Sequence, residues 1–277
     1  MKTTLKTLAL ATLLLPGIAS AEMSKAEIAK ASQNPLTAMY SLPIQNNTYF
    51  NNAYDGKTKN VSNFQPVLPF DFNDDWQVVT RTIMPLVSQP TYTRPATQGG
   101  YDREFGLGDT TFTAFFTPKT TGESGWIWGV GPSFYLPTAS DPDLGTEKWG
   151  AGLSAVALKM DGKWVYGALL AQMWSFAGPG QDAGEKIVNG MTIQPFVNYN
   201  MDDGWFLTTV PIITANWDAD EYHNVWTVPV GAGIGRAMKL GKIPMTAQLH
   251  GYYNVMTPDD YGEEWQMRVQ VQLLFPR

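Results

Sequence analysis

The sequence predicts an all-β fold, an antiparallel up-and-down transmembrane β-barrel of about 12 strands. Three observations predict it: polar and apolar residues alternate along the candidate strands, short and long connections alternate between them, and tryptophans stand near their ends. Because successive side chains of a strand point to opposite faces, an alternating strand can place one face against lipid and the other in a polar lumen.

The chain begins with the features of a signal peptide. Lys2 and Lys6 precede the apolar run 8–15, and small residues suited to cleavage follow. This order predicts export through a cleaved signal peptide of residues 1–21. The next segment, 22–37, contains helix formers, so we expect a short N-terminal periplasmic helix or plug there; a loosely held terminus is the alternative.

Residues 38–277 are expected to form the barrel. A strand that crosses a membrane needs about 9–11 residues, and twelve segments have a suitable length. The clearest is 264–275, whose odd-numbered residues are all apolar and whose even-numbered residues are polar except Leu274. The expected strands are 38–50, 60–71, 76–87, 107–117, 126–137, 149–160, 164–176, 189–200, 205–217, 224–238, 244–256 and 264–275.

The connections and the tryptophans support the same fold. Short and long connections alternate, as in barrels with tight periplasmic turns and longer outer loops. The short connections 161–163, 202–204 and 240–242 contain the glycine that tight hairpins favour. All ten tryptophans stand near an expected strand end, where an apolar ring with a polar N–H suits a membrane interface.

Proline residues inside the expected strands oppose this regularity, because proline cannot donate a hydrogen bond to the neighbouring strand. We expect them at bulges, or opposite carbonyls that turn toward water in the lumen. They are Pro43, Pro66, Pro85, Pro132, Pro195, Pro211 and Pro229.

The composition excludes several classes of protein. The chain has no cysteine, which excludes disulfides and thiolate chemistry. Its net charge is −6, and −8 once Lys2 and Lys6 leave with the signal peptide, which argues against binding nucleic acid. After the signal peptide no uninterrupted run of 18 apolar residues predicts a transmembrane helix. We expect no cofactor and no metal.

Several short motifs occur in a set order between residues 34 and 277. They are Gly106–Thr110 (GLGDT), Phe115–Lys119 (FFTPK), Trp128–Pro132 (WGVGP), Leu136–Ala139 (LPTA), Leu144–Gly152 (LGTEKWGAG), Gln194–Phe196 (QPF), Trp226–Pro229 (WTVP) and Leu274–Arg277 (LFPR). Together they resemble the bacterial outer-membrane family named for the meta-pathway of phenol degradation, a family of transporters. The resemblance implies an outer-membrane barrel that passes small or aromatic compounds, and it implies no site residues.

The lumen wall is the candidate functional site. Projected inward, the alternation places these residues along the path of a substrate: Arg81, Asp109, Lys159, Gln194, Asn198, Arg236, Gln248, His250, Glu264, Gln266, Arg268 and Gln270. Gln45, Asn47, Gln65 and Gln77 project the same way. The three arginines opposite Asp109 and Glu264 would form either a selectivity ladder or a salt-bridged plug, and the sequence does not choose between them.

Two features were considered for other chemistry. His250 lies on the polar face of its strand without a recognisable serine partner, so we expect a hydrogen-bonded lumen residue and no enzyme. Acidic clusters in the outer loops predict either a solvated surface or divalent cations that bridge to lipopolysaccharide. They are Asp141, Asp143 and Glu147; Asp182 and Glu185; Asp218, Asp220 and Glu221; Asp259, Asp260 and Glu263.

The expected function is therefore a channel or uptake protein of the cell outer membrane that passes small compounds, aromatic ones included, by passive diffusion. Its expected partners are the lipid bilayer, lipopolysaccharide, the outer-membrane insertion machinery and a small-molecule substrate, with no nucleic acid. A closed barrel with a structural or surface-interaction role is the alternative, and an outer-membrane hydrolase is the third possibility.

Overall fold

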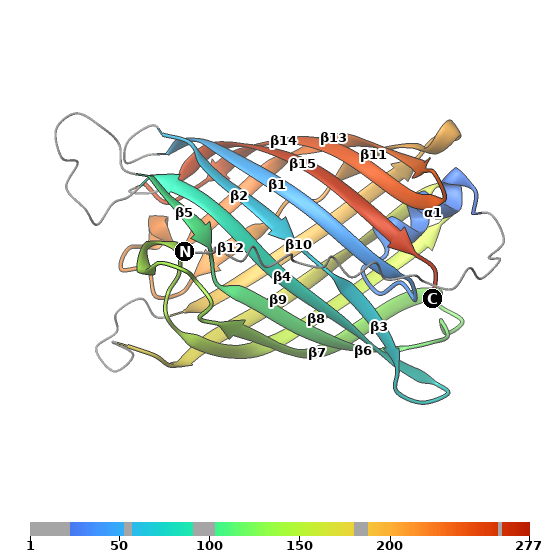
Figure 1. The fold of residues 1–277 in the computed structure, drawn as a ribbon, viewed down its shortest axis with the longest axis horizontal. Coiled ribbons are helices and arrows are strands. Elements are labelled where there is room, and N and C mark those ends of the chain that lie inside the picture. Colours follow the sequence, from blue (N-terminus) through green and yellow to red (C-terminus); the bar gives the residue numbers. More distant parts are fainter. Residues whose placement is uncertain (1–22, 53–56, 91–102, 180–187, 260–261) are drawn as a thin grey trace, which may run out of the picture.

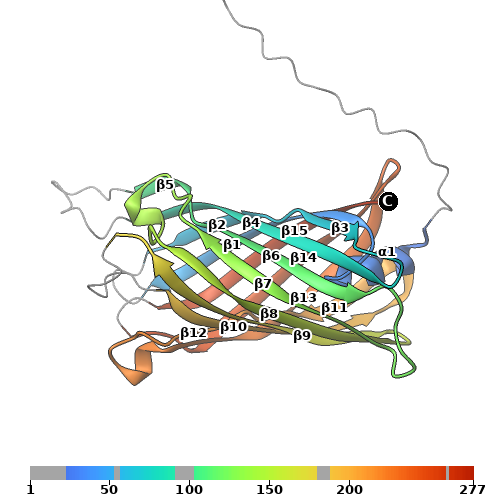
Figure 2. The same ribbon diagram turned by 90° about the horizontal axis from the view of Figure 1, so that it is seen from below.

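The computed structural model describes residues 23–52, 57–90, 103–179, 188–259 and 262–277. Within these ranges the chain forms a closed antiparallel β-barrel of twelve strands, seen from two sides in Figures 1 and 2. The predicted fold class is confirmed. The predicted signal peptide, and the loop residues Asp182, Glu185 and Asp260, lie outside the described ranges.

The described residues form one α-helix and fifteen strand segments. In chain order they are α1 (Lys25–Gln33), β1 (Tyr40–Asn52), β2 (Lys59–Phe64), β3 (Val67–Asp71), β4 (Trp76–Pro90), β5 (Arg103–Leu107), β6 (Thr110–Pro118), β7 (Trp126–Leu136), β8 (Trp149–Asp161), β9 (Trp164–Ala177), β10 (Asn189–Asn200), β11 (Trp205–Thr209), β12 (Ile213–Asn216), β13 (Trp226–Leu240), β14 (Ile243–Met256) and β15 (Glu263–Phe275). No described helix is long and apolar enough to cross a membrane.

Fifteen segments make twelve barrel strands because three strands are each broken in two. β2 continues as β3, β5 as β6, and β11 as β12. Sequence neighbours pair antiparallel around the wall, and β1 pairs with β15 along its whole length, which closes the barrel. All twelve expected strands are present; the largest displaced end is that of β5, which begins at Arg103 where 107 was expected.

The two ends of the barrel differ as the loop rhythm predicts. One end, here called the turn end, carries the connections 72–75, 119–125, 162–163, 201–204 and 241–242, together with α1 and the chain end. All of these except 119–125 are shorter than every connection at the other end. The opposite end, the loop end, carries 53–58, 91–102, 137–148, 178–188, 217–225 and 257–262. The turn end is on the right in Figure 1. At Gly162 and Gly241 the backbone has a positive φ, which glycine adopts without steric cost.

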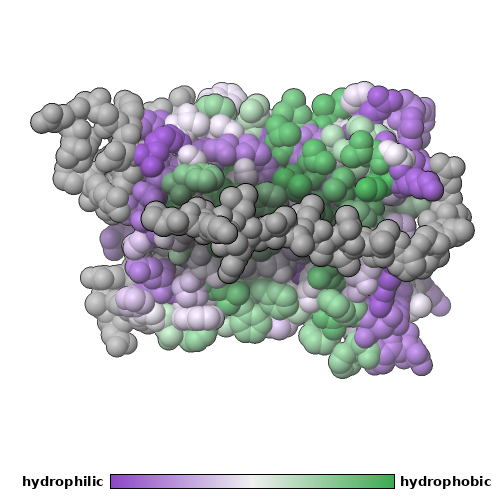
Figure 3. Space-filling view, in the orientation of Figure 1, coloured by the Kyte–Doolittle hydropathy of each residue, from purple (hydrophilic) through white to green (hydrophobic). Residues whose placement is uncertain are grey.

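Strand alternation separates an outer face from a lumen face. In β15, Gln266, Arg268 and Gln272 are buried, whereas the intervening Trp265, Met267 and Val269 remain 42–50% exposed on the outside. Apolar side chains cover much of the outer surface between two more polar ends (Figure 3). A hydrogen-bonded polar patch on the outer face of β1 and β2 is an exception, formed by Asn46, Thr48, Asn60 and Ser62.

The tryptophans lie at the ends of the strands and pack against other aromatic rings. At the turn end Trp76 meets Trp128 edge to face, with ring centroids 5.8 Å apart. At the loop end Trp217 and Trp226 do the same at 5.4 Å. Edge-to-face packing of exposed rings at both ends agrees with two interfacial girdles.

The prolines lie largely where a strand is already interrupted. Pro66 separates β2 from β3, Pro211 lies between β11 and β12, and Pro229 stands at a register shift in β13. The register on either side of the break between β11 and β12 aligns Pro195 of β10 with Pro211. Pro195, which cannot donate a hydrogen bond, therefore faces the stretch between β11 and β12, where no strand ladder forms. Its missing N–H thus removes no hydrogen bond from an intact ladder.

The N-terminal segment covers the turn end from inside the barrel. Ser24 caps α1 in a capping box with Glu27, which satisfies free N–H groups at the start of the helix. The helix buries Ile28 and Ala29 against Phe206, Ala237 and Leu274 from the barrel wall. α1 lies within the segment 22–37, where a short helix or plug was expected. Leu274, the one departure from polar alternation in its strand, is an inward contact for this helix.

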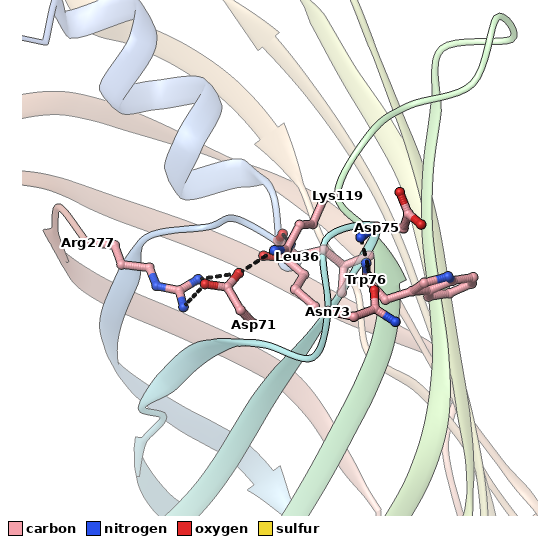
Figure 4. Close-up of polar contacts among 8 residues, drawn as sticks. Leu36, Asp71, Asn73, Asp75, Trp76, Lys119 and Arg277 are labelled. Carbon is pink, nitrogen blue, oxygen red and sulfur yellow. Dashed lines mark hydrogen bonds and ion pairs between the residues drawn. The ribbon is translucent and has the colours of Figure 1, made fainter.

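Ion pairs tie the chain end to the rim beside this helix. Asp71, at the end of β3, accepts from both guanidinium nitrogens of Arg277 at 2.6 and 3.2 Å, and Lys119 Nζ lies 2.8 Å from the same carboxylate (Figure 4). β3 makes a single pairing with β1, Ser41 with Val67. The ion pairs thus link the end of β3 to the residues that follow β15, beside the single residue pair that joins β3 to β1.

Candidate functional site

A cavity occupies the lumen on the loop-end side of α1. Its free volume, including the part open to solvent, is about 900 Å³. Residues from β1, β3, β4, β9, β10, β14 and β15 line it, and residues 32–35 at the end of α1 form its floor. Its lining is Ser32, Gln33, Asn34, Pro35, Ser41, Pro43, Gln45, Gln65, Val67, Arg81, Leu169, Gln194, Phe196, Asn198, Val210, Gln248, His250, Arg268, Gln270 and Gln272.

The polar wall of this cavity is built on β1, β14 and β15, and Arg268 is its centre. The guanidinium donates from Nε to Asn47 Oδ1 at 2.9 Å and from Nη1 to the backbone carbonyl of Val210 at 2.8 Å. The same Asn47 oxygen accepts from Gln266 at 2.9 Å and from Gln45 at 3.2 Å. One amide oxygen therefore holds three donors from two adjacent strands.

The break between β11 and β12 leaves backbone groups that this wall satisfies. The Val210 N–H donates to the Tyr252 hydroxyl at 3.2 Å, while its carbonyl takes the Arg268 bond. The Tyr252 hydroxyl lies 2.9 Å from His250 Nδ1, and His250 Nε2 lies 3.1 Å from Gln248 Oε1. Since the hydroxyl accepts from Val210, its proton serves His250 Nδ1, and a neutral ring then donates from Nε2 to Gln248.

Arg81 of β4 faces the cavity from the other side of the first break. Its Nη2 donates to Gln65 Oε1 at 2.5 Å, and Gln65 lies just before Pro66. Gln65 Nε2 in turn approaches Gln45 Oε1 at 3.5 Å. Both lumenal arginines are thus held by amide or backbone oxygens beside strand breaks.

The opposite wall is apolar. Inward residues of β4, β6, β8, β9 and β10 form one buried cluster with Leu36 and Val67: Val79, Phe115, Val156, Leu158, Val165, Leu169 and Phe196. The expectation that lumen faces are polar is wrong at these positions, although β4 and β10 also place Arg81, Gln194 and Asn198 on the cavity. A barrel of this width can fill part of its interior with side chains, and here an apolar cluster seals one side while the cavity occupies the other.

Most of the predicted lumen residues come together at the cavity. Arg81, Gln194, Asn198, Gln248, His250, Arg268 and Gln270 line it, and Gln266 contacts it through Asn47. Gln45 and Gln65, which project the same way, also line it, and the buried Gln77 bonds to the Leu36 carbonyl nearby.

Two predicted lumen residues lie on the outside. Lys159 shares its face of β8 with Leu153, which is 66% exposed, while the alternate residue Leu158 is fully buried. Arg236 shares the outer face of β13 with Ile234; it bonds Asp203 at 2.6 Å and stacks over the Trp205 ring. Both lie near the turn end, where a long basic side chain reaches the polar interface.

The two predicted carboxylates stand at the loop end and do not oppose the arginines. Asp109 lies in the gap between β5 and β6 and accepts from the backbone N–H groups of Ala139 and Thr146 at 3.1 and 2.6 Å. It therefore anchors the connection 137–148. Glu264 is exposed at the start of β15. The predicted ladder of arginines opposite carboxylates is not formed.

Sequence reasoning missed the floor and the apolar wall of the cavity. The sequence signal for the floor was Asn34-Pro35 at the end of a short helix, and Gln33 bonds Asn200 across the lumen. For the wall, the inward Leu169 and Phe196 gave no signal because an apolar residue in a barrel strand predicts contact with lipid. Among the described residues, no three His, Asp or Glu gather closely enough to hold a metal ion.

Comparison with known proteins shows the fold. No protein-family model and no curated protein sequence matches the chain. An outer membrane channel from Pseudomonas putida F1 is similar with a TM-score of 0.60 and 16% identity, over 86% of this chain and 94% of that one. Outer membrane phospholipase A from Escherichia coli (TM-score 0.45, 15% identity, 90% and 97% covered) and a FadL homologue from Pseudomonas aeruginosa (0.43, 10%, 89% and 92%) are similar more distantly. The chain has the fold of the outer-membrane β-barrels.

Proposed function

We propose that the chain is an outer-membrane channel or uptake protein that passes small compounds, aromatic ones included, by passive diffusion. The observation that carries the proposal is the lumenal cavity, which has one polar wall and one apolar wall and ends at a short helix. Such a lining can accept a molecule with both kinds of surface. The helix is held by one small apolar cluster and a few polar contacts, so its displacement would open the turn end.

The proposal includes the setting of the protein. It comprises export through the signal peptide of residues 1–21, insertion by the outer-membrane machinery, and contact with lipid and lipopolysaccharide. The barrel fold and the apolar outer face support these parts of the proposal. Membership of the phenol meta-pathway family remains part of this proposal, supported by the ordered motifs and by the shared fold of an outer membrane channel.

A closed structural barrel is a second candidate, and the buried helix α1 favours it. Ile28 is fully buried and Ala29 is 1% exposed, so the turn end is covered in this conformation. The two candidates differ in whether α1 leaves.

Catalysis is not proposed. His250 is bonded to Tyr252 and Gln248, so both of its ring nitrogens are engaged. Neither partner is placed as an acyl nucleophile that faces lipid. The ring lies in the lumen with 2% exposure, away from the outer face where a lipid ester would approach.

Planar-bilayer recording of the purified, refolded protein tests the proposal. We expect conductance from the full mature chain, and a larger or more frequently open conductance from a variant that lacks residues 23–37. Barrel folding of both is checked by the mobility shift on heating before electrophoresis. Absence of conductance from both folded proteins would overturn the channel and support the closed barrel.

A further inference from the structure

We infer that the lumenal cavity binds a small organic anion, a carboxylate on an apolar body, with the carboxylate held by Arg268 and Arg81 and the body against the wall that contains Leu169 and Phe196. The inference rests on the proposed uptake function and names the class of substrate. Three observations carry it: an unpartnered buried donor, an unbalanced positive charge, and an adjacent apolar surface.

The unpartnered donor belongs to Arg268. Its side chain is among the most completely buried in the protein, and the residue is 1% exposed. Nε and Nη1 are bonded to Asn47 and Val210, whereas Nη2 has no hydrogen-bond partner among the described residues. A buried charged donor without an acceptor is costly, so a ligand oxygen at this position would be stabilising.

The charge around this donor is positive. Arg81 and Arg268 both line the cavity and repel each other electrostatically, and the lining residues include no aspartate or glutamate. The oxygens that hold the two guanidinium groups belong to Asn47, Gln65 and Val210, which are neutral. An anion between the two arginines would relieve this repulsion, and the low dielectric of the interior strengthens the effect.

The apolar surface lies in the same cavity. Leu169 and Phe196 line it and belong to the apolar cluster, with Val67 and Val210 also in the lining. A purely inorganic anion would leave this surface against water, whereas an anion with a hydrocarbon or ring body would cover it. Burial of apolar ligand surface contributes about 25 cal/mol per Å², which favours the amphiphilic anion over acetate or chloride.

A structural role alone does not account for this arrangement. Arg268 does satisfy the carbonyl that the strand break exposes at Val210, but that bond uses one of the five guanidinium donors. Among the described residues Arg81 makes one hydrogen bond, to Gln65, and it lines the same cavity. A neutral donor would serve the carbonyl equally well at a lower desolvation cost.

Isothermal titration calorimetry of the folded full-length barrel in detergent tests the inference with benzoate and hexanoate as probes. Benzamide keeps the ring and lacks the charge, and acetate keeps the charge and lacks the body. We expect benzoate and hexanoate to bind about 10- to 100-fold more tightly than benzamide or acetate, the ratio that one or two charge-assisted hydrogen bonds supply.

Arg81→Gln and Arg268→Lys are the informative variants, and Arg103→Gln is the matched control. Arg103 is exposed at the loop end, where it donates to the carbonyls of Thr58 and Ser88. We expect Arg81→Gln to lower benzoate affinity about tenfold and to leave benzamide unchanged, with Arg103→Gln equal to the unaltered chain. Arg268→Lys keeps the charge, so its loss should be smaller than that of Arg268→Gln where the heat-shift assay shows that both fold. Arg81→Gln, which leaves the bond from Arg268 to the Val210 carbonyl intact, keeps the test valid if they do not.

The outcomes separate this inference from the proposed function. Equal binding of benzoate and benzamide, or a benzoate affinity that Arg81→Gln leaves unchanged, overturns the anion site even where bilayer conductance persists. Anion-selective binding without any conductance, including from the variant lacking residues 23–37, keeps the site and overturns the channel.

Discussion

Gln33 and Asn200 bond each other reciprocally inside the barrel. Gln33 Nε2 donates to Asn200 Oδ1 at 2.9 Å, and Asn200 Nδ2 donates to Gln33 Oε1 at 3.0 Å. Both residues are buried, so both bonds are shielded from water. The pair fastens the end of α1 to the end of β10, beside the floor of the lumenal cavity.

Asn200→Ala should loosen this helix. The change leaves the buried Gln33 amide without its partner, which costs about 1–3 kcal/mol and shifts the docked helix toward the undocked state about 5- to 150-fold. We expect a higher open probability in planar bilayers at an unchanged heat-shift temperature of the barrel. Asn46→Ala, on the outer face of β1, is the control; an equal rise there would assign the effect to the barrel wall.

Ile28→Asp should release the helix more completely. Ile28 is fully buried against the wall, and a carboxylate there loses its apolar contacts and its hydration together. Ala26→Asp places the same charge on the exposed side of α1. We expect faster proteolytic removal of the N-terminal segment and larger conductance from Ile28→Asp alone. Identical behaviour of the two variants would show that α1 does not control access.

Docking of α1 should weaken in acid through Asp203. A hydrogen bond from Lys25 of the helix, and then one from Arg236, holds the pKa of the Asp203 carboxyl below its usual value. Because the carboxyl pKa of Asp203 is lower in the docked state, its contribution to the stability of docking is fully present above the ordinary carboxyl pKa, near 4. That contribution is lost as the pH falls through the lower pKa of the docked state. We expect conductance to rise as the pH drops below about 4. Asp203→Asn lacks this contribution at every pH, so its conductance should already be raised at neutral pH and should respond less to acid. An unchanged acid response in that variant would exclude Asp203 as its source.

Tyr252→Phe should destabilise the barrel at the break between β11 and β12. The hydroxyl accepts from the Val210 N–H and bonds His250, so its removal leaves buried polar groups unpaired. The expected cost is about 1–3 kcal/mol, seen as unfolding at lower urea concentration. Tyr253→Phe is the matched control, since Tyr253 is 43% exposed on the outer face beside Trp265. Equal urea midpoints for the two variants would contradict the role given to Tyr252.

Asp71→Asn should lower the temperature of the mobility shift by a small amount. The carboxylate is exposed and pairs with Arg277 and Lys119, and pairs in contact with solvent contribute little to stability. Lys163→Gln removes a comparable exposed pair with Asp202 at the same end, one that links the turns 162–163 and 201–204 and does not involve the chain end. A shift in the first variant alone would show that the pairs matter because they join β3 to the chain end.

The sequence alone predicts the fold of this protein and much of one lumen wall. Alternation in residues 264–275 identifies the inward Gln266, Arg268 and Gln270, because a strand has a period of two and each neighbour is apolar. Connection lengths and tryptophan positions depend on the sequence in the same local way. Each of these signals is carried by residues close together in the chain.

Two predictions failed where alternation was blurred or ended. Arg236 follows the small residues Gly231–Gly235, which give no apolar partner face to fix its direction, and it lies outside beside Asp203. Lys159 stands near the end of β8. A basic side chain there can reach the polar membrane interface from the outer face as readily as it can reach water from the lumen face.

Only the tertiary structure decided what the lumen contains. The polar face of β15 becomes one side of a cavity because α1 folds back beneath it and because Leu169 and Phe196 turn inward from strands far along the chain. Whether an apolar strand residue meets lipid or lumen depends on which way the sheet closes, and closure is a property of all twelve strands together. The spare donor of Arg268 exists for the same reason, because its two partners come from different parts of the closed sheet. Asn47 lies on the adjacent β1, whereas Val210 lies at the break between β11 and β12, beyond β14 and β13.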